Sequence, residues 1–373
     1  MTMSELPGDV VEEILCHVPA ASLKRLRSTC KRWNLLFDDP RFVREHFDKA
    51  VRVRQLMTKE LKICSVNVNH HGVLSIDVSG KLNLINRHFI LIRIAEVFHH
   101  DGLLLCTIKY STSLVLWNPC TGQAKCIPAK DPYKTRHGTF ALGSYQDKKS
   151  GYNSYKILSY DNGGTETKTD KFSIYEFKSN SWKILDVTLD FDLTRIDNRV
   201  TFKGKTYWFA VDEKENHHAI FLLSFDYTTE RFGRMNLPYQ LFPYISRTDM
   251  ALSVVRDEKL FVLLQLTNTS RTEVWVTNKI DETKVVPWSM VLAVDHSRED
   301  IMSGVRFLVD DEKKFVVCFD WKSLVKDGKV HYENMVHIIK EDNKVRKVDF
   351  AAPTKLLHWS QLFNYVPSLV QIQ

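Results

Sequence analysis

The spacing of hydrophobic residues changes once along the chain, near residue 50. Before this point apolar residues recur at three- and four-residue steps, which is typical of amphipathic helices. The two stretches with this spacing hold Val10, Val11, Ile14, Leu15 and Val18, and then Leu23, Leu26, Cys30 and Trp33. After this point the period is two, as in half-buried strands. The pattern therefore predicts a small helical unit followed by a large β domain.

Signals for helix ends punctuate the first 50 residues. Asp9 is placed to cap the first helix, and acidic residues follow in its first turn, where the helix dipole favours them. Pro19 ends this helix. Asp39 and Pro40 combine a capping side chain with proline at the first helical position and so open a third helix. We expect three short helices in this unit.

A helical unit of this size has little apolar surface to bury by itself. Ordering its backbone costs roughly 1–2 kcal/mol per residue, which burial has to offset. The unit is therefore expected to pack against the downstream domain, or against another protein that offers a groove for an amphipathic helix. The pattern leaves both possibilities open.

Several short motifs in this unit resemble the F-box. They are Leu6-Pro7-x-Asp9-Val10-x-x-Glu13-Ile14-Leu15, Val18-Pro19, Ser22-Leu23, Arg25-Leu26-Arg27, Cys30-Lys31-x-Trp33, and Asp39-Pro40-x-Phe42 with His46. The resemblance implies a three-helix unit over residues 1–50 that docks on the Skp-type adaptor of a cullin-RING ubiquitin ligase. The rest of the chain would recruit the protein to be ubiquitinated.

The same resemblance implies which residues form or support the adaptor-binding face. These are Leu6, Pro7, Val10, Ile14, Leu15, Val18, Pro19, Leu23, Leu26, Cys30 and Trp33. The pattern does not distinguish the residues that contact the adaptor from those that hold the motif together.

The β domain contains a repeat. Apolar strands that end in an aromatic residue continue through a turn in LVLWNPCTGQAKCIP, FSIYEFKSNSWKILD, LLSFDYTTERFGRMNLP and EVWVTNKIDETKVVPW. Their aromatic anchors, spaced by 58, 50 and 50 residues, are Trp117, Tyr175, Phe225 and Trp275. A period near 50 is that of a four-stranded kelch-type blade, and about 320 residues give room for about six. With only 14 glycines in the chain, we predict a degenerate kelch-like β-propeller of about six blades, with a β-sandwich as the alternative.

The β domain also resembles the F-box-associated interaction domain of the first type, a large family in plants. The resemblance rests on HHDGLLLCTIKYSTSLVLWNPCTGQAKCIP, on VTFKGKTYWFAV with FLLSFDYTTERFGRMNLP, on EVWVTNKI and on the ending YVPSLVQI. It places this domain at residues 95–373, after a connecting segment with the first strands at residues 51–94. Members of this family are viewed as target-binding subunits, so the resemblance implies a role and leaves the target unknown.

Composition argues against several classes of function. Lys and Arg number 52 against 45 Asp and Glu, a formal net charge of +7, and the two signs are interleaved. We therefore expect no nucleic-acid partner, and we interpret the basic run from Lys24 to Arg32 as a solvated or adaptor-facing helix face. No stretch has the pattern of a membrane helix or a secretion signal, which predicts no membrane partner and a location in the nucleus and/or cytoplasm. The seven cysteines have no disulfide spacing and are expected to be reduced, with Cys120 and Cys126 buried across one hairpin.

No motif of catalysis or cofactor binding is present. The sequence contains no G-x-S-x-G, P-loop, G-x-G-x-x-G or H-E-x-x-H. The doublets His70-His71, His99-His100 and His217-His218 are poor chelates, because neighbours on a strand point to opposite faces. We interpret them as turn or surface residues. The prediction is a non-catalytic protein without a cofactor or a metal.

Two hypotheses of function remain. The leading one is the substrate-recognition subunit of a Skp-cullin-F-box ubiquitin ligase, with a Skp-type adaptor, a cullin-RING core and an unknown protein substrate as partners. The alternative is a non-catalytic propeller that binds proteins or ligands outside a ligase. In both, we expect the target on loops, with segments 130–153, 161–171 and 212–218 as candidates, or at the mouth of a central channel.

Overall fold

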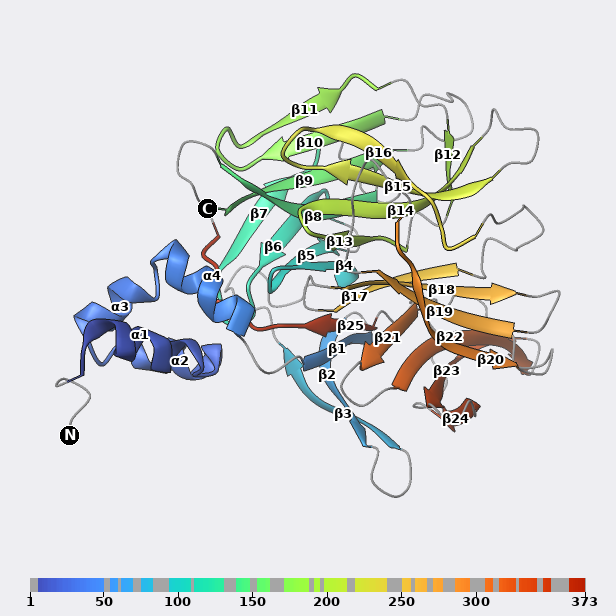
Figure 1. The fold of residues 1–373 in the computed structure, drawn as a ribbon, viewed down its shortest axis with the longest axis horizontal. Coiled ribbons are helices and arrows are strands. Elements are labelled where there is room, and N and C mark those ends of the chain that lie inside the picture. The colour runs from blue at the N-terminus through green and yellow to red at the C-terminus, as the bar shows by residue number, and fades with distance from the viewer. Residues whose placement is uncertain are drawn as a thin grey trace.

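The computed structural model places a helical unit beside a β domain, as the pattern predicts (Figure 1). It describes residues 6–49, 54–59, 62–69, 75–82, 94–108, 111–130, 139–147, 153–161, 171–187, 191–194, 198–212, 219–239, 250–255, 259–266, 271–277, 286–295, 306–310, 315–326, 329–340, 345–349 and 362–372. Two of the three histidine doublets and most of the predicted target loops lie outside these ranges. None of the described helices is long and apolar enough to cross a membrane.

The helical unit contains four helices within residues 6–49, one more than predicted. They are α1 (Gly8–Cys16), α2 (Ala20–Leu26), α3 (Lys31–Leu36) and α4 (Pro40–Lys49). The second predicted helix is divided because Cys30 adopts an extended conformation, with φ −149° and ψ 128°, so that α3 begins anew at Lys31.

The two predicted N-caps have different outcomes. α1 begins at Gly8 with Pro7 in the N-cap position, so Asp9 lies inside the first turn and the prediction that it caps the helix was wrong. Asp39 caps α4 as predicted, since its Oδ1 accepts a hydrogen bond from the backbone N–H of Arg41 at 2.8 Å. This bond and the Arg41 side chain hold the pKa of Asp39 below its usual value, the side chain having the larger effect.

The described residues of the β domain form six antiparallel sheets. The first three contain β1 (Arg54–Lys59), β2 (Lys62–Asn69), β3 (Ser75–Leu82) and β25 (Leu362–Tyr365); then β4 (Ile94–His100), β5 (Leu103–Ile108), β6 (Ser113–Trp117) and β7 (Ala124–Pro128); then β8 (Thr139–Gln146), β9 (Asn153–Asp161), β10 (Lys171–Glu176) and β11 (Ser181–Leu185).

The other three sheets contain β12 (Phe191–Thr194), β13 (Val200–Phe202), β14 (Lys205–Asp212), β15 (Ile220–Asp226) and β16 (Arg231–Met235); then β17 (Met250–Val255), β18 (Lys259–Leu266), β19 (Arg271–Thr277) and β20 (Ser289–Asp295); then β21 (Arg306–Asp310), β22 (Phe315–Lys326), β23 (Lys329–Lys340) and β24 (Val345–Asp349).

The sheets succeed one another around a ring. One strand at the inner end of each sheet contacts the next sheet, in the order β4, β8, β13, β17, β21 and β25, and β1, which is paired with β25, contacts β4. The ring is closed by pairing of the last described strand with the first, in the register Arg54↔Tyr365 to Met57↔Leu362. Sheets arranged around a closed ring form a propeller, in which the inner edge of each sheet is covered by its neighbours. This confirms the predicted propeller and makes the β-sandwich alternative wrong.

The predicted repeat marks equivalent strands. The four aromatic anchors lie on β6, β10, β15 and β19, each the third strand of its sheet from the inner end, and each is followed by the outermost strand. Tyr175 pairs with Trp182, and Phe225 pairs with Phe232 in the matching register. The hydrophobic cores lie between the faces of neighbouring sheets; Ile174 and Leu223, for example, belong to one shared cluster.

Candidate functional site

The helical unit has its own small core, which separates the residues proposed for the adaptor face into two groups. Leu15 and Leu23 are fully buried in this core, together with Val11, Phe37 and Phe42. The side chains of Leu15 and Leu23 hold the helices together, so neither leucine is available to a partner.

The second group faces outward. Pro7 and Pro19 are exposed, and Val10 and Ile14, one turn apart on α1, each keep 40% of their surface exposed. Four others are half-buried against the helical core: Leu6, Val18, Leu26 and Trp33. Cys30 is also half-buried, at the break before α3. The structure thus divides a set that the motif left undivided.

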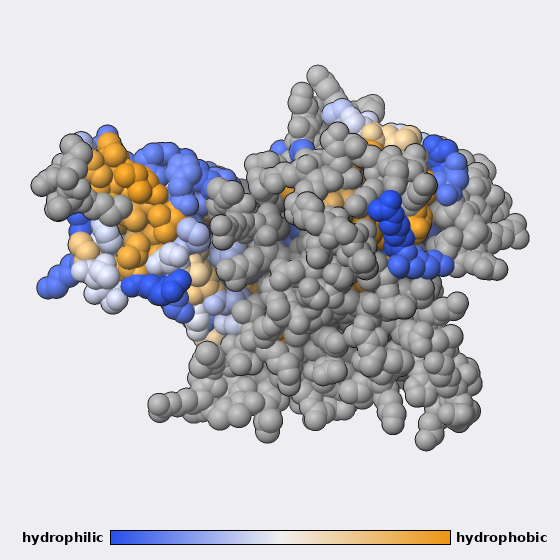
Figure 2. Space-filling view, turned by 90° about the horizontal axis from the view of Figure 1, so that it is seen from below, coloured by the Kyte–Doolittle hydropathy of each residue, from blue (hydrophilic) through white to orange (hydrophobic). Residues whose placement is uncertain are grey.

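One exposed residue was missed by the sequence reasoning. Leu35 on α3 is 72% exposed, more than any other large hydrophobic residue among those the structure describes. No pattern in the sequence signalled this exposure, because Leu35 lies beyond Trp33, the last residue of the predicted stripe, and the break at Cys30 reorients α3. We name the exposed residues Val10, Ile14 and Leu35 the apolar face of the helical unit, and Figure 2 shows hydrophobic surface gathered on this unit.

Hydrogen bonds and ion pairs hold the helices that carry this face. Lys49 on α4 bonds to Glu13 on α1 at 2.6 Å and to Glu45 at 2.7 Å, and its hydrogen bond lowers the pKa of Glu13. His46 Nε2 donates to the carbonyl of Val18 at 2.8 Å. Because His46 is buried, its pKa is lowered in spite of this bond.

The predicted basic run is divided between two roles. Arg27 donates to the Asp38 carboxylate and to the Phe37 carbonyl, both at 2.8 Å, and so closes the turn before α4. The side chains of Lys24, Arg25, Lys31 and Arg32 are exposed, as expected for a solvated helix face.

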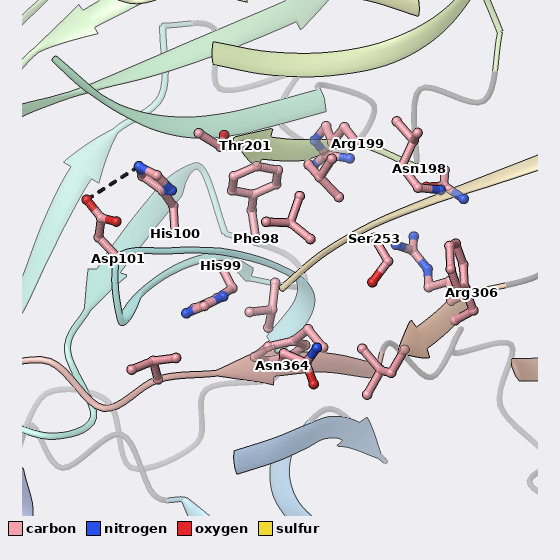
Figure 3. A pocket seen from close by; sticks show the side chains of 18 of the residues that line it. Phe98, His99, His100, Asp101, Asn198, Arg199, Thr201, Ser253, Arg306 and Asn364 are labelled. Atoms are coloured by element: carbon pink, nitrogen blue, oxygen red, sulfur yellow. Dashed lines mark hydrogen bonds and ion pairs between the residues drawn. The ribbon is translucent and has the colours of Figure 1, made fainter. Parts of the chain in front are cut away.

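The second candidate site is a cavity of about 130 Å³ in the middle of the ring, lined by residues of β4, β13, β17, β21 and β25 and by Phe47 of α4. Figure 3 shows the side chains that converge on it, among them Phe98, Asn198, Ser253 and Asn364. The sequence reasoning named the mouth of a central channel as a place for a target, and the cavity lies in this position. The sequence reasoning did not identify the lining residues, which come from strands as far apart as β4 and β25, where Glu96 and Asn364 lie 268 positions apart in the sequence.

Arg199 organises one wall of the cavity. Its Nε donates to the Phe140 carbonyl at 2.8 Å, its Nη1 to Glu96 at 2.9 Å, and its guanidinium lies 5.4 Å from the centre of the Phe98 ring. These partners belong to two other sheets, so one buried cation connects three neighbouring sheets. The charge of Arg199 is thereby compensated by Glu96 inside the wall.

A buried polar cluster lies beside the cavity. His100 Nε2 contacts Asp101 Oδ2 at 3.5 Å (Figure 3) and Ser144 Oγ at 2.9 Å. The hydroxyl of Tyr155 donates to Asp101 at 3.1 Å. Serine, histidine and aspartate are the residue types of a hydrolase triad. Both contacts of His100 involve the same ring nitrogen, however, so the ring cannot pass a proton from Ser144 to Asp101 as a triad does.

The prediction that the His99-His100 doublet lies in a turn or on the surface was wrong. His100 is buried on β4, and the His99 ring stacks on Phe363 at 5.8 Å and meets Tyr365 edge-on at 5.5 Å. The two rings do point to opposite faces of the strand, as expected. Burial lowers the pKa of His99 to about 3, so the ring is neutral. Among the described residues, no three His, Cys, Asp or Glu side chains gather as metal ligands would.

The cysteine prediction is corrected in part. None of the six cysteines whose side chains the structure describes forms a disulfide, but Cys126 is exposed, and Cys120 lies in the turn after β6 against the helical core. They are not packed across a hairpin, because Val115 rather than Cys120 is the partner of Cys126 in the register.

Two family models match the chain. That of the F-box domain matches residues 3–45, and that of the F-box associated beta propeller domain matches residues 54–372. The chain belongs to the F-box proteins with an F-box associated β-propeller. Both resemblances found in the sequence are thereby confirmed.

Relatives of the same kind match over their full length or nearly so. Probable F-box protein At5g47300 of Arabidopsis thaliana is 52% identical over 378 residues, covering 100% of this chain and 88% of that protein. Putative F-box protein At3g25460 is 50% identical, covering 100% and 99%, and F-box/kelch-repeat protein At3g44120 is 42% identical, covering 100% and 97%, both from the same organism. Among solved structures, a chain of a nidogen/laminin complex matches at 12% identity with a TM-score of 0.45, covering 80% of this chain and 94% of that one.

Proposed function

We propose that this F-box protein is the substrate-recognition subunit of a Skp-cullin-F-box ubiquitin ligase. The F-box would dock on a Skp-type adaptor, and the propeller would hold a protein target near the ubiquitin-loaded enzyme. The observation that carries the proposal is the apolar face: within an F-box whose core is closed, Val10, Ile14 and Leu35 remain exposed. A contiguous apolar patch on the surface of a folded unit marks a site for a partner, and Figure 2 shows hydrophobic surface gathered on the helical unit.

The contribution of this subunit is tethering rather than bond chemistry. A target held on the propeller meets the ligase at an effective concentration far above its free concentration, which raises the rate of ubiquitin transfer without any catalytic group in this chain. The target would bind at the cavity in the middle of the ring or on the outer turns of the propeller. The subunit would act in the nucleus and/or cytoplasm.

The experiment is a tagged pull-down of the full chain from plant cells with the proteasome inhibited, read by mass spectrometry. A variant with Val10, Ile14 and Leu35 all changed to Gln is run in parallel. A Skp-type adaptor and a cullin that are recovered with the wild type and lost with the variant support the receptor role. Recovery of neither with the wild type would sink it, and the chain would then be a propeller that acts outside a ligase.

A further inference from the structure

The segment 366–372, which follows β25, runs between the helical unit and the β domain, and Figure 1 places this end of the chain beside α4. Leu369 in this segment is fully buried and belongs to the helical core with Leu15 and Leu23. Its neighbour Val370 packs against this core and against the large core cluster of the propeller. The helical unit thus completes its core with a residue that follows the last strand of the propeller.

One buried side chain of the propeller makes two hydrogen bonds to this segment. Asn118, fully buried after β6, donates through Nδ2 to the carbonyls of Ser368 at 3.0 Å and Val370 at 2.8 Å. Its Oδ1 accepts from the backbone N–H groups of Cys120 at 2.8 Å and Thr121 at 3.2 Å, which fixes the β6–β7 turn. The same amide therefore ties the segment to a rigid hairpin on both sides of Leu369.

Two further contacts extend the attachment. The Gln123 side chain accepts a hydrogen bond from the backbone N–H of Ile372 at 3.0 Å. At the other end, Gly102 has φ +74°, and a Cβ built on it would lie 2.3 Å from Cβ of Ser368. The segment thus lies directly on the β4–β5 turn, at a distance that only glycine permits.

We propose that segment 366–372 is the fastening that fixes the orientation of the F-box relative to the propeller. Leu369 is held in the helical core, while the carbonyls on either side of it are held by Asn118. The helical unit cannot turn against the propeller unless Leu369 leaves its core or these hydrogen bonds break. If the proposed function holds, on which this role rests, the fastening sets the geometry in which a target faces the adaptor.

The test measures the distance between the two units in the full chain, by single-molecule energy transfer between labels at the exposed positions Arg25 on α2 and Ile184 on β11. In the wild type a single narrow distribution is expected. Leu369→Asp places a charge in the helical core, and Asn118→Asp keeps the acceptor for the β6–β7 turn but removes both donors to the segment. Each is expected to broaden the distribution clearly, to about twice its width or more.

Control variants separate orientation from stability. Leu369→Met keeps an apolar side chain of similar volume, so this variant should show the narrow distribution of the wild type, unlike Leu369→Asp. Leu264→Ala removes an equally buried leucine from the propeller core and should lower the melting temperature with the distribution unchanged. A narrow, wild-type distribution in both Asp variants, with circular dichroism showing them folded, would overturn the proposal. Adaptor binding by the unlabelled wild type is measured separately, so its absence would count against the proposed function and not against the fastening.

Discussion

The apolar face makes a quantitative prediction about adaptor binding. Replacing Val10, Ile14 and Leu35 together by Gln removes the exposed apolar surface while keeping residues that favour a helix. Fully burying a Val, Ile or Leu side chain stabilises a complex by about 1.5–3 kcal/mol. Scaled by exposed fractions of 40%, 40% and 72%, the three side chains contribute about 2–5 kcal/mol. Since each 1.4 kcal/mol is tenfold in Kd, the variant should bind at least about 30-fold more weakly.

The assay is titration calorimetry of the purified chain against a purified Skp-type adaptor, together with a thermal melt of the free chain. The melting temperature should change little, because these side chains already contact water in the folded protein. The control variant changes Met290 and Val291 on β20 to Gln. These two residues are each 46% exposed and lie on the outermost strand of their sheet in the propeller. It should bind the adaptor as the wild type does. If the triple variant binds within threefold of the wild type, the apolar face is not the docking surface.

Three further predictions concern stability. Leu15→Ala should destabilise the helical unit by about 2–5 kcal/mol in urea unfolding, because it leaves a cavity in the small core; an effect below about 1 kcal/mol would show that the core is not closed as described. The pKa of His99 in the folded state, about 3, lies below the ordinary value near 6.5, so His99 contributes stability that is complete above pH 6.5 and is lost as the pH falls toward 3. Between pH 7.5 and 4.5 the wild type should therefore lose on the order of 2–3 kcal/mol more than His99→Phe, and equal acid losses in the two proteins would refute burial of a neutral ring. Gly143→Ala should cost about 1–3 kcal/mol or more, because a Cβ there would lie within 2 Å of the ring of the buried Tyr227, at 1.9 Å from Cε2; a melting temperature equal to that of the wild type would contradict this packing.

The sequence by itself determined the class of each part of the chain. Periods of three to four residues and of two residues record which side of a helix or strand faces a core, and they are local properties. The four aromatic anchors recur at equivalent positions because each lies on the third strand of its sheet, before the hairpin that leads to the outermost strand. The helical unit and the β-propeller were predictable for this reason, whereas the F-box was identified by the resemblance of its motifs to that family. The cap at Asp39 was predictable because its hydrogen-bond partner is two residues away.

The tertiary structure decided which predicted residues are exposed and which are buried. Leu15 and Ile14 are neighbours in one motif, yet one is buried in the helical core and the other faces outward. The extended backbone at Cys30 turned α3 and exposed Leu35, and burial of His99 depends on Phe363 and Tyr365 from the far end of the chain.

The attachment of the F-box was the least predictable feature. The sequence left open whether the helical unit packs on the downstream domain or on a partner, and the structure shows Leu369 in its core. The hydrogen bond between Asn118 and Val370 joins residues 252 positions apart, so no local sequence pattern could predict it. A ring that closes its last strand on its first brings such residues together, and only the closed ring determines which ones meet.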